Sequence, residues 1–266
     1  MPQSDRRIVC HFSCGAASAV ATKLILSEYD REQVVILNAF IAEEHPDNRR
    51  FLADCETWFD HPITVLRDEH YGASVHEVWR KRKYIKNHFG APCSGILKRE
   101  VIEAACLPDD LHVYGFTVDE IERTLRLHSA HWKFPLIERN LTHNDCLAMI
   151  ERAGLKLPEM YRLGFNNANC IGCCKGGMGY WNKIREVFPD VFERVVQIQE
   201  SIGPGSYLHW DRETGIRFGL KDLPRDKGDH TEPLPSCSFF CAMAEEEFDM
   251  VEAEEDEEVP DEIPQP

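Results

Sequence analysis

The stretch from Arg7 to Glu28, RIVCHFSCGAASAVATKLILSE, decides the fold. Residues 7–12 are mostly apolar and β-branched, which predicts a short buried strand. Six small residues follow, Ser13-Cys14-Gly15-Ala16-Ala17-Ser18, and they predict a tight turn. The run from Ala19 to Glu28 is rich in Ala, Leu and Val and predicts a helix. A strand that passes through such a turn into a helix is typical of the opening unit of an α/β fold.

The same alternation continues along the chain. Strands that alternate with helices predict a twisted parallel sheet with helices on both faces. The further strands are expected at 34–40, 63–66 and 111–116, and the further helices at 48–59, 74–86 and 98–105.

Beyond Glu120 the pattern is mostly helical. Thr142 is the expected N-cap of a helix that stops at Gly154, with Asp145 three residues after the cap. Residues 179–201 predict a helix interrupted near Pro189, and 206–223 predict an irregular or weakly stranded stretch. We therefore expect three parts: an α/β core at 1–140, a helical and irregular region that packs on it at 141–244, and a tail at 245–266.

The tail carries most of the charge. The formal net charge is −16 at pH 7, but the chain from Glu245 onward holds twelve acidic residues and no Lys or Arg, so the remainder carries only −4. Such a segment cannot bury a core and is expected to be disordered. It would serve as a solubilising end or, alternatively, imitate an anionic ligand or cover a basic surface. No apolar run approaches the length of a membrane span and no apolar leader opens the chain, so we expect a cytoplasmic protein without membrane contact.

The turn at 13–18 is a candidate anion site. In an open α/β sheet, ligands bind beyond the carboxyl ends of the strands. Small side chains let backbone N–H groups approach a phosphate, the N-terminus of the following helix adds partial positive charge, and Ser13 and Ser18 can donate hydroxyl hydrogen bonds. The alternative is that the small residues only allow close packing. No Gly-Lys-Ser/Thr follows, so the turn is not a Walker A loop.

Three thiols lie within five residues, Cys170, Cys173 and Cys174. Thiols of a cytoplasmic chain stay reduced, so the cluster indicates metal or redox chemistry rather than disulfides. Cys170 and Cys173 have a spacing that suits zinc, but adjacent side chains such as Cys173 and Cys174 rarely reach one ion. A multi-iron cluster offers them separate irons, so a [4Fe–4S] cluster is favoured over zinc. Cys93, in an expected Pro-Cys turn, is the candidate fourth ligand; Cys237 and Cys241 are rivals.

Basic residues gather in the middle of the chain, at 80–86 and again at Lys98 and Arg99. A charge run is most often a solvated helix face. Beside the Pro-Cys turn, however, these residues could bind a phosphate or sulfate group, or a nucleic-acid backbone. The balanced charge of residues 1–244 argues against an extended nucleic-acid footprint but permits a local one.

Together these segments resemble the phosphoadenosine phosphosulfate reductase family of the PP-loop, or adenine nucleotide alpha hydrolase, superfamily. The resemblance extends from about Ile8 to about Gly203, and its last part is similar to reductase-like proteins often carried by phages. The segments that carry it are the 13–18 turn, Pro92-Cys93-Ser94-Gly95-Ile96-Leu97-Lys98, 115–123, Pro135-Leu136-Ile137, Pro158-Glu159-Met160-Tyr161, 169–173 and Gly179-Tyr180-Trp181-Asn182.

The resemblance implies an adenine-nucleotide enzyme of sulfur transfer or sulfonucleotide reduction. ATP, adenylyl sulfate or its phosphorylated form would be the nucleotide, with Mg²⁺ as a further candidate ion. A nucleic-acid acceptor, a thiol or sulfur-donor protein and a homodimer are candidate partners, and the compartment would be the host cytoplasm for a phage-encoded chain. The nucleotide would be held by Ser13, Cys14, Gly15, Ala16, Ala17, Ser18, Lys98, Arg99, Arg123 and Arg126, and the cluster by Cys93, Cys170, Cys173 and Cys174.

The sequence departs from the family pattern at informative positions. Ala16 and Ala17 stand where the superfamily carries a Lys or an Asp, and Thr117 stands where an arginine is usual near the sulfate. The C-terminal nucleophilic cysteine has no clear equivalent, so Cys237, Cys241 and Arg123 are the catalytic candidates. The alternative function is a catalytically inactive nucleotide-binding module with a structural zinc or cluster and an acidic tail that binds a partner.

Overall fold

The computed structural model describes residues 6–86, 90–124, 129–211 and 214–229. Its centre is a five-stranded, all-parallel sheet in the order β3-β2-β1-β4-β5. This confirms the expected α/β class. The short edge strand β5 was not expected. The strands are β1 (Ile8–His11), β2 (Val34–Ala39), β3 (Ile63–Leu66), β4 (Leu111–Val113) and β5 (Trp132–Lys133).

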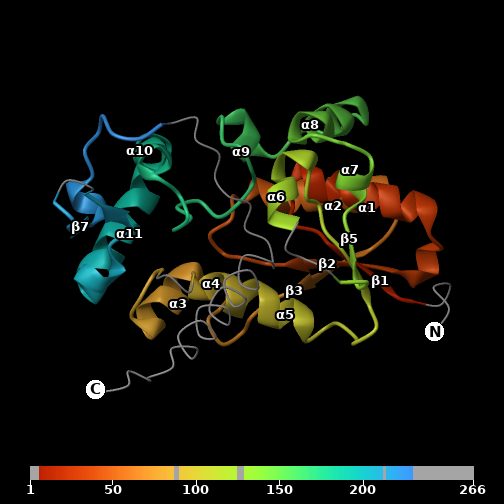
Figure 1. The fold of residues 1–266 in the computed structure, drawn as a ribbon, viewed down its shortest axis with the longest axis horizontal. Helices are drawn as coiled ribbons and strands as arrows, with labels where there is room; N and C mark the ends of the chain where they lie inside the picture. The colour runs from red at the N-terminus through yellow and green to blue at the C-terminus, as the bar shows by residue number, and fades with distance from the viewer. Residues whose placement is uncertain (1–5, 87–89, 125–128, 212–213, 230–266) are drawn as a thin grey trace, which may run out of the picture.

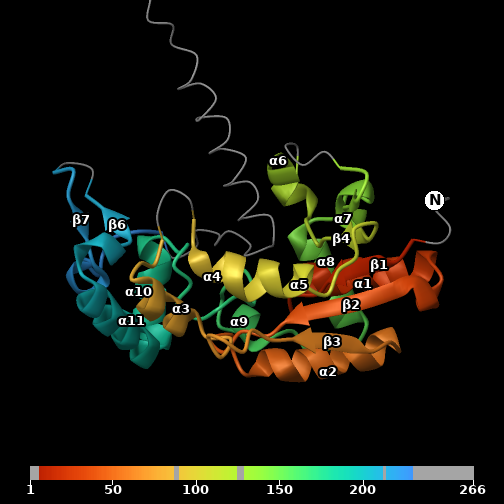
Figure 2. The same cartoon turned by 90° about the horizontal axis from the view of Figure 1, so that it is seen from below.

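Helices cover both faces of this sheet (Figure 1). Alternate side chains of β1 point to opposite faces. Ile8, Cys10 and Phe12 pack under α1, α2 and α8 in one apolar cluster. Val9 packs on the other face with Leu37 and Ile102, beneath the helix that enters β4. Figure 2 shows α2 running along β3 at the edge of the sheet.

The described helices agree with the sequence in order and partly in length. The predicted capping box at Thr142 and Asp145 is confirmed, and α10 and α11 are separated at Pro189 as predicted. The α-helices are α1 (Ala16–Glu28), α2 (Asp47–Phe59), α3 (Val75–Arg82), α4 (Pro92–Ser94), α5 (Val101–Glu103), α6 (Ile121–Thr124), α7 (Pro135–Glu138), α8 (His143–Arg152), α9 (Glu159–Arg162), α10 (Met178–Val187) and α11 (Pro189–Ile202). Short 3₁₀ turns occupy Arg31–Gln33, Val118–Glu120, Pro204–Ser206 and Leu220–Asp222.

Two helix starts were predicted too late. α1 begins at Ala16 rather than at Ala19. The helix expected at 98–105 begins at Pro92, runs through a π-helical segment (Gly95–Glu100) and ends as α5. Cys93 therefore lies in the first helical turn, not in a loop. Proline is well suited to that position, because its missing N–H is not needed there and its φ is already helical.

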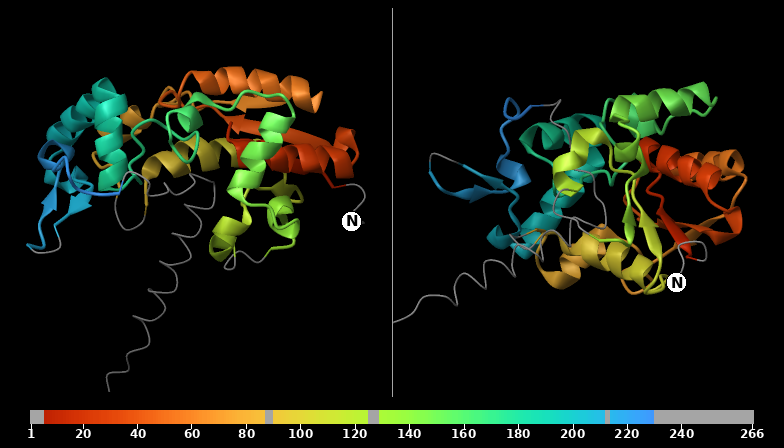
Figure 3. Two further views of the ribbon diagram at one scale, coloured as in Figure 1. Left: turned by 90° about the horizontal axis from the view of Figure 1, so that it is seen from above. Right: turned by 45° about the vertical axis from the view of Figure 1, so that its right-hand side comes forward.

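A second apolar cluster lies beyond the sheet. It joins α3 and the start of the Pro92 helix to α10 and α11, and the loop with Cys170, Cys173 and Cys174 belongs to it. The hairpin of β6 (His209–Trp210) and β7 (Arg217–Phe218) confirms the weak strand character expected at 206–223. Figure 3 shows α10, α11 and this hairpin at one end of the molecule and the sheet at the other.

These two clusters do not divide the chain at residue 140. α3 packs with the C-terminal helices, whereas α8 packs against α1 on the sheet. The acidic tail at 245–266 lies outside the described residues. Within the residues that are described, no helix is both long and apolar enough to cross a membrane.

Candidate functional site

A cavity of about 840 Å³ lies at the carboxyl ends of the central strands. Its wall includes Phe12 and Ser13, the two residues after β1, Ala39 at the end of β2 and Tyr114 directly after β4. The chain leaves β1 toward β2 and β3 at one edge of the sheet, and it leaves β4 toward β5 at the other edge, so β1 and β4 flank the topological switch point. Ligands of open α/β sheets bind at this position.

The 13–18 turn forms one wall of the cavity. Ser13, Gly15, Ala17 and Ser18 line it. The Ser18 hydroxyl organises the turn: it accepts hydrogen bonds from the Ser13 N–H (3.1 Å) and the Ser13 hydroxyl (3.2 Å) and donates to the Gly15 carbonyl (2.9 Å). The N–H groups of the first turn of α1, which have no acceptor within the helix, follow immediately, and that of Ala16 donates to the Tyr161 hydroxyl oxygen. The turn is thus shaped before any ligand arrives.

Cys14 and Ala16 belong to the turn but do not line the cavity. Both are fully buried behind it. Cys14 has a left-handed backbone (φ 58°), which is unusual outside glycine. Its sulfur accepts hydrogen bonds from the Asn38 amide (3.5 Å) and the Arg49 guanidinium (3.7 Å). Burial raises the pKa of Cys14 to about 12, so this thiol holds the turn in place and is not a nucleophile.

Gly115 brings β4 against the start of α1. A Cβ at this position would lie 2.7 Å from the backbone nitrogen of Ser18 and 2.9 Å from the carbonyl carbon of Ala17. Only glycine permits so close an approach without a backbone shift. Gly115 therefore sets the width of the cavity between the turn and the segment after β4.

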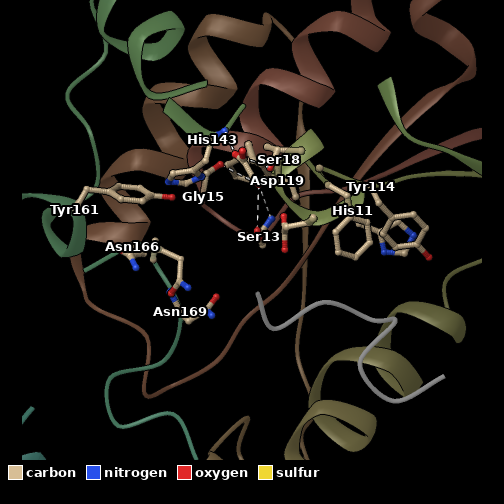
Figure 4. A pocket seen from close by; sticks show the side chains of 18 of the residues that line it. His11, Ser13, Gly15, Ser18, Tyr114, Asp119, His143, Tyr161, Asn166 and Asn169 are labelled. Carbon is tan, nitrogen blue, oxygen red and sulfur yellow. Dashed lines mark hydrogen bonds between the residues drawn. The ribbon is translucent and has the colours of Figure 1, made fainter. Parts of the chain in front are cut away.

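The opposite wall comes from 161–169, which is far away in sequence. Tyr161 and Asn166 line the cavity, and Figure 4 shows Asn166 and Asn169 on the side of the cavity away from the His11 and Tyr114 rings. Those two rings stack at 4.2 Å between centroids, and the His11 Nε2 lies 3.0 Å from the His112 Nδ1. The cavity thus offers an aromatic surface on one side and amide groups on the other.

Charges in the described wall are mostly negative. Lys98 is the one Lys or Arg among its described residues, and its Nζ pairs with the Glu44 carboxylate at 3.4 Å. Both side chains are almost fully buried, and Asn48 donates a further hydrogen bond to Glu44 (3.1 Å). The other described carboxylates of the wall are Asp119, Glu120 and Glu122.

Glu44 also joins the cavity to the cysteine loop. Its backbone forms an antiparallel bridge with Cys170, and the Ile171 N–H donates to the Glu43 carbonyl (2.9 Å). The cavity wall itself continues through Asn169 directly into Cys170. The 13–18 turn and the thiols are therefore two ends of one connected wall.

Three of the four predicted thiol ligands meet in space. Cys174 hydrogen-bonds with both Cys93 and Cys173, although Cys93 lies in a distant helix. The hydrogen bond with Cys174, aided by the backbone N–H and the charge of Lys175, lowers the pKa of Cys173 to about 6. Hydrogen bonding to Cys174 likewise lowers the pKa of Cys93, and that of Cys174 rises because it keeps the proton. None of the nine described cysteines is part of a disulfide.

Tyr180 of α10 holds the cysteine loop closed. Its hydroxyl oxygen accepts from the N–H groups of Gly172 (2.9 Å) and Cys173 (3.0 Å), and its hydrogen is donated to the Cys170 carbonyl (3.2 Å). A Cβ at Gly176 would lie 2.0 Å from the Tyr180 ring. The glycines that follow the thiols thus leave room for the ring that shapes the loop.

The thiols suit a soft metal centre in donor type and in burial. In their present positions they hydrogen-bond with one another, and within the described residues no group of three or more His, Cys, Asp or Glu side chains is placed to hold a metal ion. Metal binding would have to replace the thiol–thiol hydrogen bonds.

The remaining predicted residues are less well placed or are not described. Arg99 is not among the residues that line the cavity. Arg123 lies in α6, with no description of its side chain, and Arg126, Cys237 and Cys241 lie outside the described residues. Tyr161, Gly115 and Glu44 were not predicted as site residues. A glycine near the end of the strand predicted at 111–116 was the one sequence signal that could have indicated Gly115.

Comparison with known proteins does not assign the chain to a family. A scan of the sequence against protein-family models finds no match, and a search of curated proteins finds no match either.

Proposed function

We propose that this protein is an adenine-nucleotide-dependent enzyme of sulfur transfer or sulfonucleotide reduction, similar to the phosphoadenosine phosphosulfate reductases of the PP-loop superfamily. The observation that carries the proposal is the single wall that joins an anion turn at the switch point of the sheet to a buried set of thiols. A nucleotide in the cavity would present its reacting group toward that set.

The phosphates would bind at the 13–18 turn. Backbone N–H groups at the start of α1 supply donors, and the helix N-terminus supplies partial positive charge. The hydroxyls of Ser13 and Ser18 would donate to a phosphate if they turned away from their present acceptors, the Ser18 hydroxyl and the Gly15 carbonyl. Lys98 would give a full positive charge if a phosphate oxygen replaced the Glu44 carboxylate as its partner. The stacked His11 and Tyr114 rings offer a surface for the adenine.

Cys93, Cys170, Cys173 and Cys174 would hold a [4Fe–4S] cluster. Such a cluster supplies one-electron chemistry or an iron site for sulfur when it is bound. The protein's contribution is visible in its own residues: Tyr180 shapes the loop, and the positive charge of Lys175 favours the thiolate form of Cys173, which is the form that binds metal.

The described wall bears on the choice of nucleotide. With four carboxylates and one lysine, the described wall would repel an anionic sulfonucleotide. ATP binds together with Mg²⁺, which carboxylates can ligate, whereas a sulfonucleotide brings no such cation. We therefore favour ATP-dependent activation of an acceptor for thiolation over reduction of adenylyl sulfate or its phosphorylated form.

A second candidate is a non-catalytic nucleotide-binding module with a structural zinc or cluster. The pair Ala16-Ala17 favours it, because neither residue provides a side chain for pyrophosphate chemistry or for a metal ion. Its acidic tail would then bind a partner protein.

Metal analysis of anaerobically purified protein tests the proposal. We expect about four irons per chain and matching sulfide in the wild type. Cys93→Ala and Cys174→Ala should both lose the iron, since their thiols meet in the structure. Cys106→Ala is the matched control and should keep it, because Cys106 lies near Arg7 and Asp110, outside the thiol set.

Full iron content in Cys93→Ala would remove Cys93 from the ligand set and redirect attention to Cys237 or Cys241. A colourless zinc protein that releases no pyrophosphate, AMP or sulfite from ATP or sulfonucleotides would support the binding module instead.

A further inference from the structure

Tyr161 reaches from α9 to the start of α1. The Ala16 N–H donates a hydrogen bond to the Tyr161 hydroxyl oxygen at 3.1 Å, across 145 positions of sequence. A Cβ at Gly15 would lie 3.3 Å from the same oxygen. Figure 4 shows the Tyr161 hydroxyl directed at Gly15 inside the cavity. The phenol oxygen thus lies at the N-terminus of α1, within hydrogen-bond distance of its first N–H.

The hydrogen of this hydroxyl is uncommitted. The oxygen accepts from Ala16, and within the described part of the chain no residue accepts a hydrogen bond from Tyr161. Burial raises the pKa of Tyr161 to about 12, against the opposing effect of the Ala16 hydrogen bond. The hydroxyl is therefore neutral and protonated at pH 7 and can act as a donor toward an anion in the cavity.

A helix cap that serves structure alone would normally come from a side chain close to the helix start in sequence. The first N–H groups of a helix are normally capped by a nearby Ser, Thr, Asp or Asn. Here the N-cap is Gly15, which has no side chain, and the capping group comes instead from the wall that continues through 164–169 to Cys170. The His143 ring lies 5.7 Å from the Tyr161 ring and lines the same cavity.

We infer that the Tyr161 hydroxyl is a ligand-binding group, which keeps its hydrogen bond from Ala16 and donates its own hydrogen to the phosphate nearest the start of α1. This inference rests on the proposed nucleotide site. It adds a donor from the distant wall to those of the turn. Phosphate binding would thereby fix α9 and the segment that leads to the cysteine loop.

Tyr161→Phe tests the inference, because it removes one oxygen and keeps the ring. Equilibrium binding of ATP, AMP and inorganic pyrophosphate should weaken about tenfold or more, the effect of losing a hydrogen bond to a charged group. Adenosine, which lacks a phosphate, should bind the variant as it binds the wild type. Tyr71→Phe is the matched control, since Tyr71 belongs to the second apolar cluster, and should leave all four ligands unaffected.

The outcomes distinguish failure of the inference about Tyr161 from failure of the proposed nucleotide site. If the wild type binds the phosphate ligands and Tyr161→Phe binds them equally well, the inference is overturned while the proposed function stands. An equal loss for adenosine would also overturn it, because the residue would then support the cavity in general. If the wild type binds none of the phosphate ligands, the proposed nucleotide site is wrong and the inference falls with it.

Discussion

At the scale of the residue, Gly115 has no room for a methyl group. The nearest atoms to its missing Cβ are backbone atoms of Ala17 and Ser18, which cannot rotate away. We expect Gly115→Ala to push the segment after β4 off the start of α1 and to lower the free energy of unfolding by about 1–3 kcal/mol. Nucleotide binding should weaken as well, because the anion turn would move. Urea denaturation and equilibrium binding measure the two effects.

Gly205→Ala is the control for this change. A Cβ there would meet nothing within 4 Å, and the backbone of Gly205 does not have a positive φ. Its stability should stay within about 0.5 kcal/mol of the wild type. If Gly115→Ala behaved in the same way, the close approach of β4 to α1 would not limit the site.

Single residues also show where sequence reasoning ends. The small residues from Ser13 to Ser18 predicted the tight turn between β1 and α1, because this signal is local in the sequence. Tyr161 and Glu44 could not be predicted as its neighbours, since their positions depend on how distant segments pack on the sheet. Arg99 was expected at the phosphates from its place beside Lys98, but adjacent positions on a helix point in different directions.

At the scale of the element, the sequence predicted type and order better than boundaries. The apolar run of residues 8–12 identifies β1, and the run rich in Ala, Leu and Val that follows the small-residue turn identifies α1. The start of the Pro92 helix was missed because Pro-Cys-Ser-Gly has the composition of a turn, whereas proline at the first helical position is equally favourable. The strand β5 has two residues, which is too short for a sequence pattern, and it is a strand because it pairs with β4.

The cysteine loop depends on an element that contributes no thiol, α10. Tyr180→Phe keeps the ring against Gly176 but leaves the N–H groups of Gly172 and Cys173 buried without their acceptor. Each such loss costs about 1–3 kcal/mol. We expect a lower free energy of unfolding and reduced metal content after anaerobic purification. Both can be measured on the same preparation.

Tyr207→Phe serves for comparison, because no described residue hydrogen-bonds with the Tyr207 hydroxyl. It should match the wild type in stability and in metal content. Unchanged stability of Tyr180→Phe would mean that the loop keeps its form without the hydroxyl, contrary to the role assigned to it.

At the scale of the whole molecule, the fold holds several histidines in the neutral form. Burial lowers the pKa of five histidines that are spread over the fold: His11, His76, His112, His143 and His209. Histidine in an unfolded chain titrates near 6.5. Below that pH the unfolded chain binds protons that the folded chain does not, so stability is full above about pH 6.5 and falls as the pH decreases.

His209 allows the sharpest test of this pH dependence. Burial, with a smaller contribution from Lys86, lowers its pKa to about 4, and it lies in β6, away from the residues that line the cavity. His209→Phe removes the titrating group and keeps an aromatic ring beside Phe218. Between pH 6.5 and 5 the wild type should lose about 1 kcal/mol per pH unit relative to the variant. Urea denaturation at pH 7.5, 6.5 and 5.5 gives both curves. Parallel curves would show that His209 takes up its proton in the folded chain as readily as in the unfolded one. The prediction that its buried ring stays neutral would then be wrong.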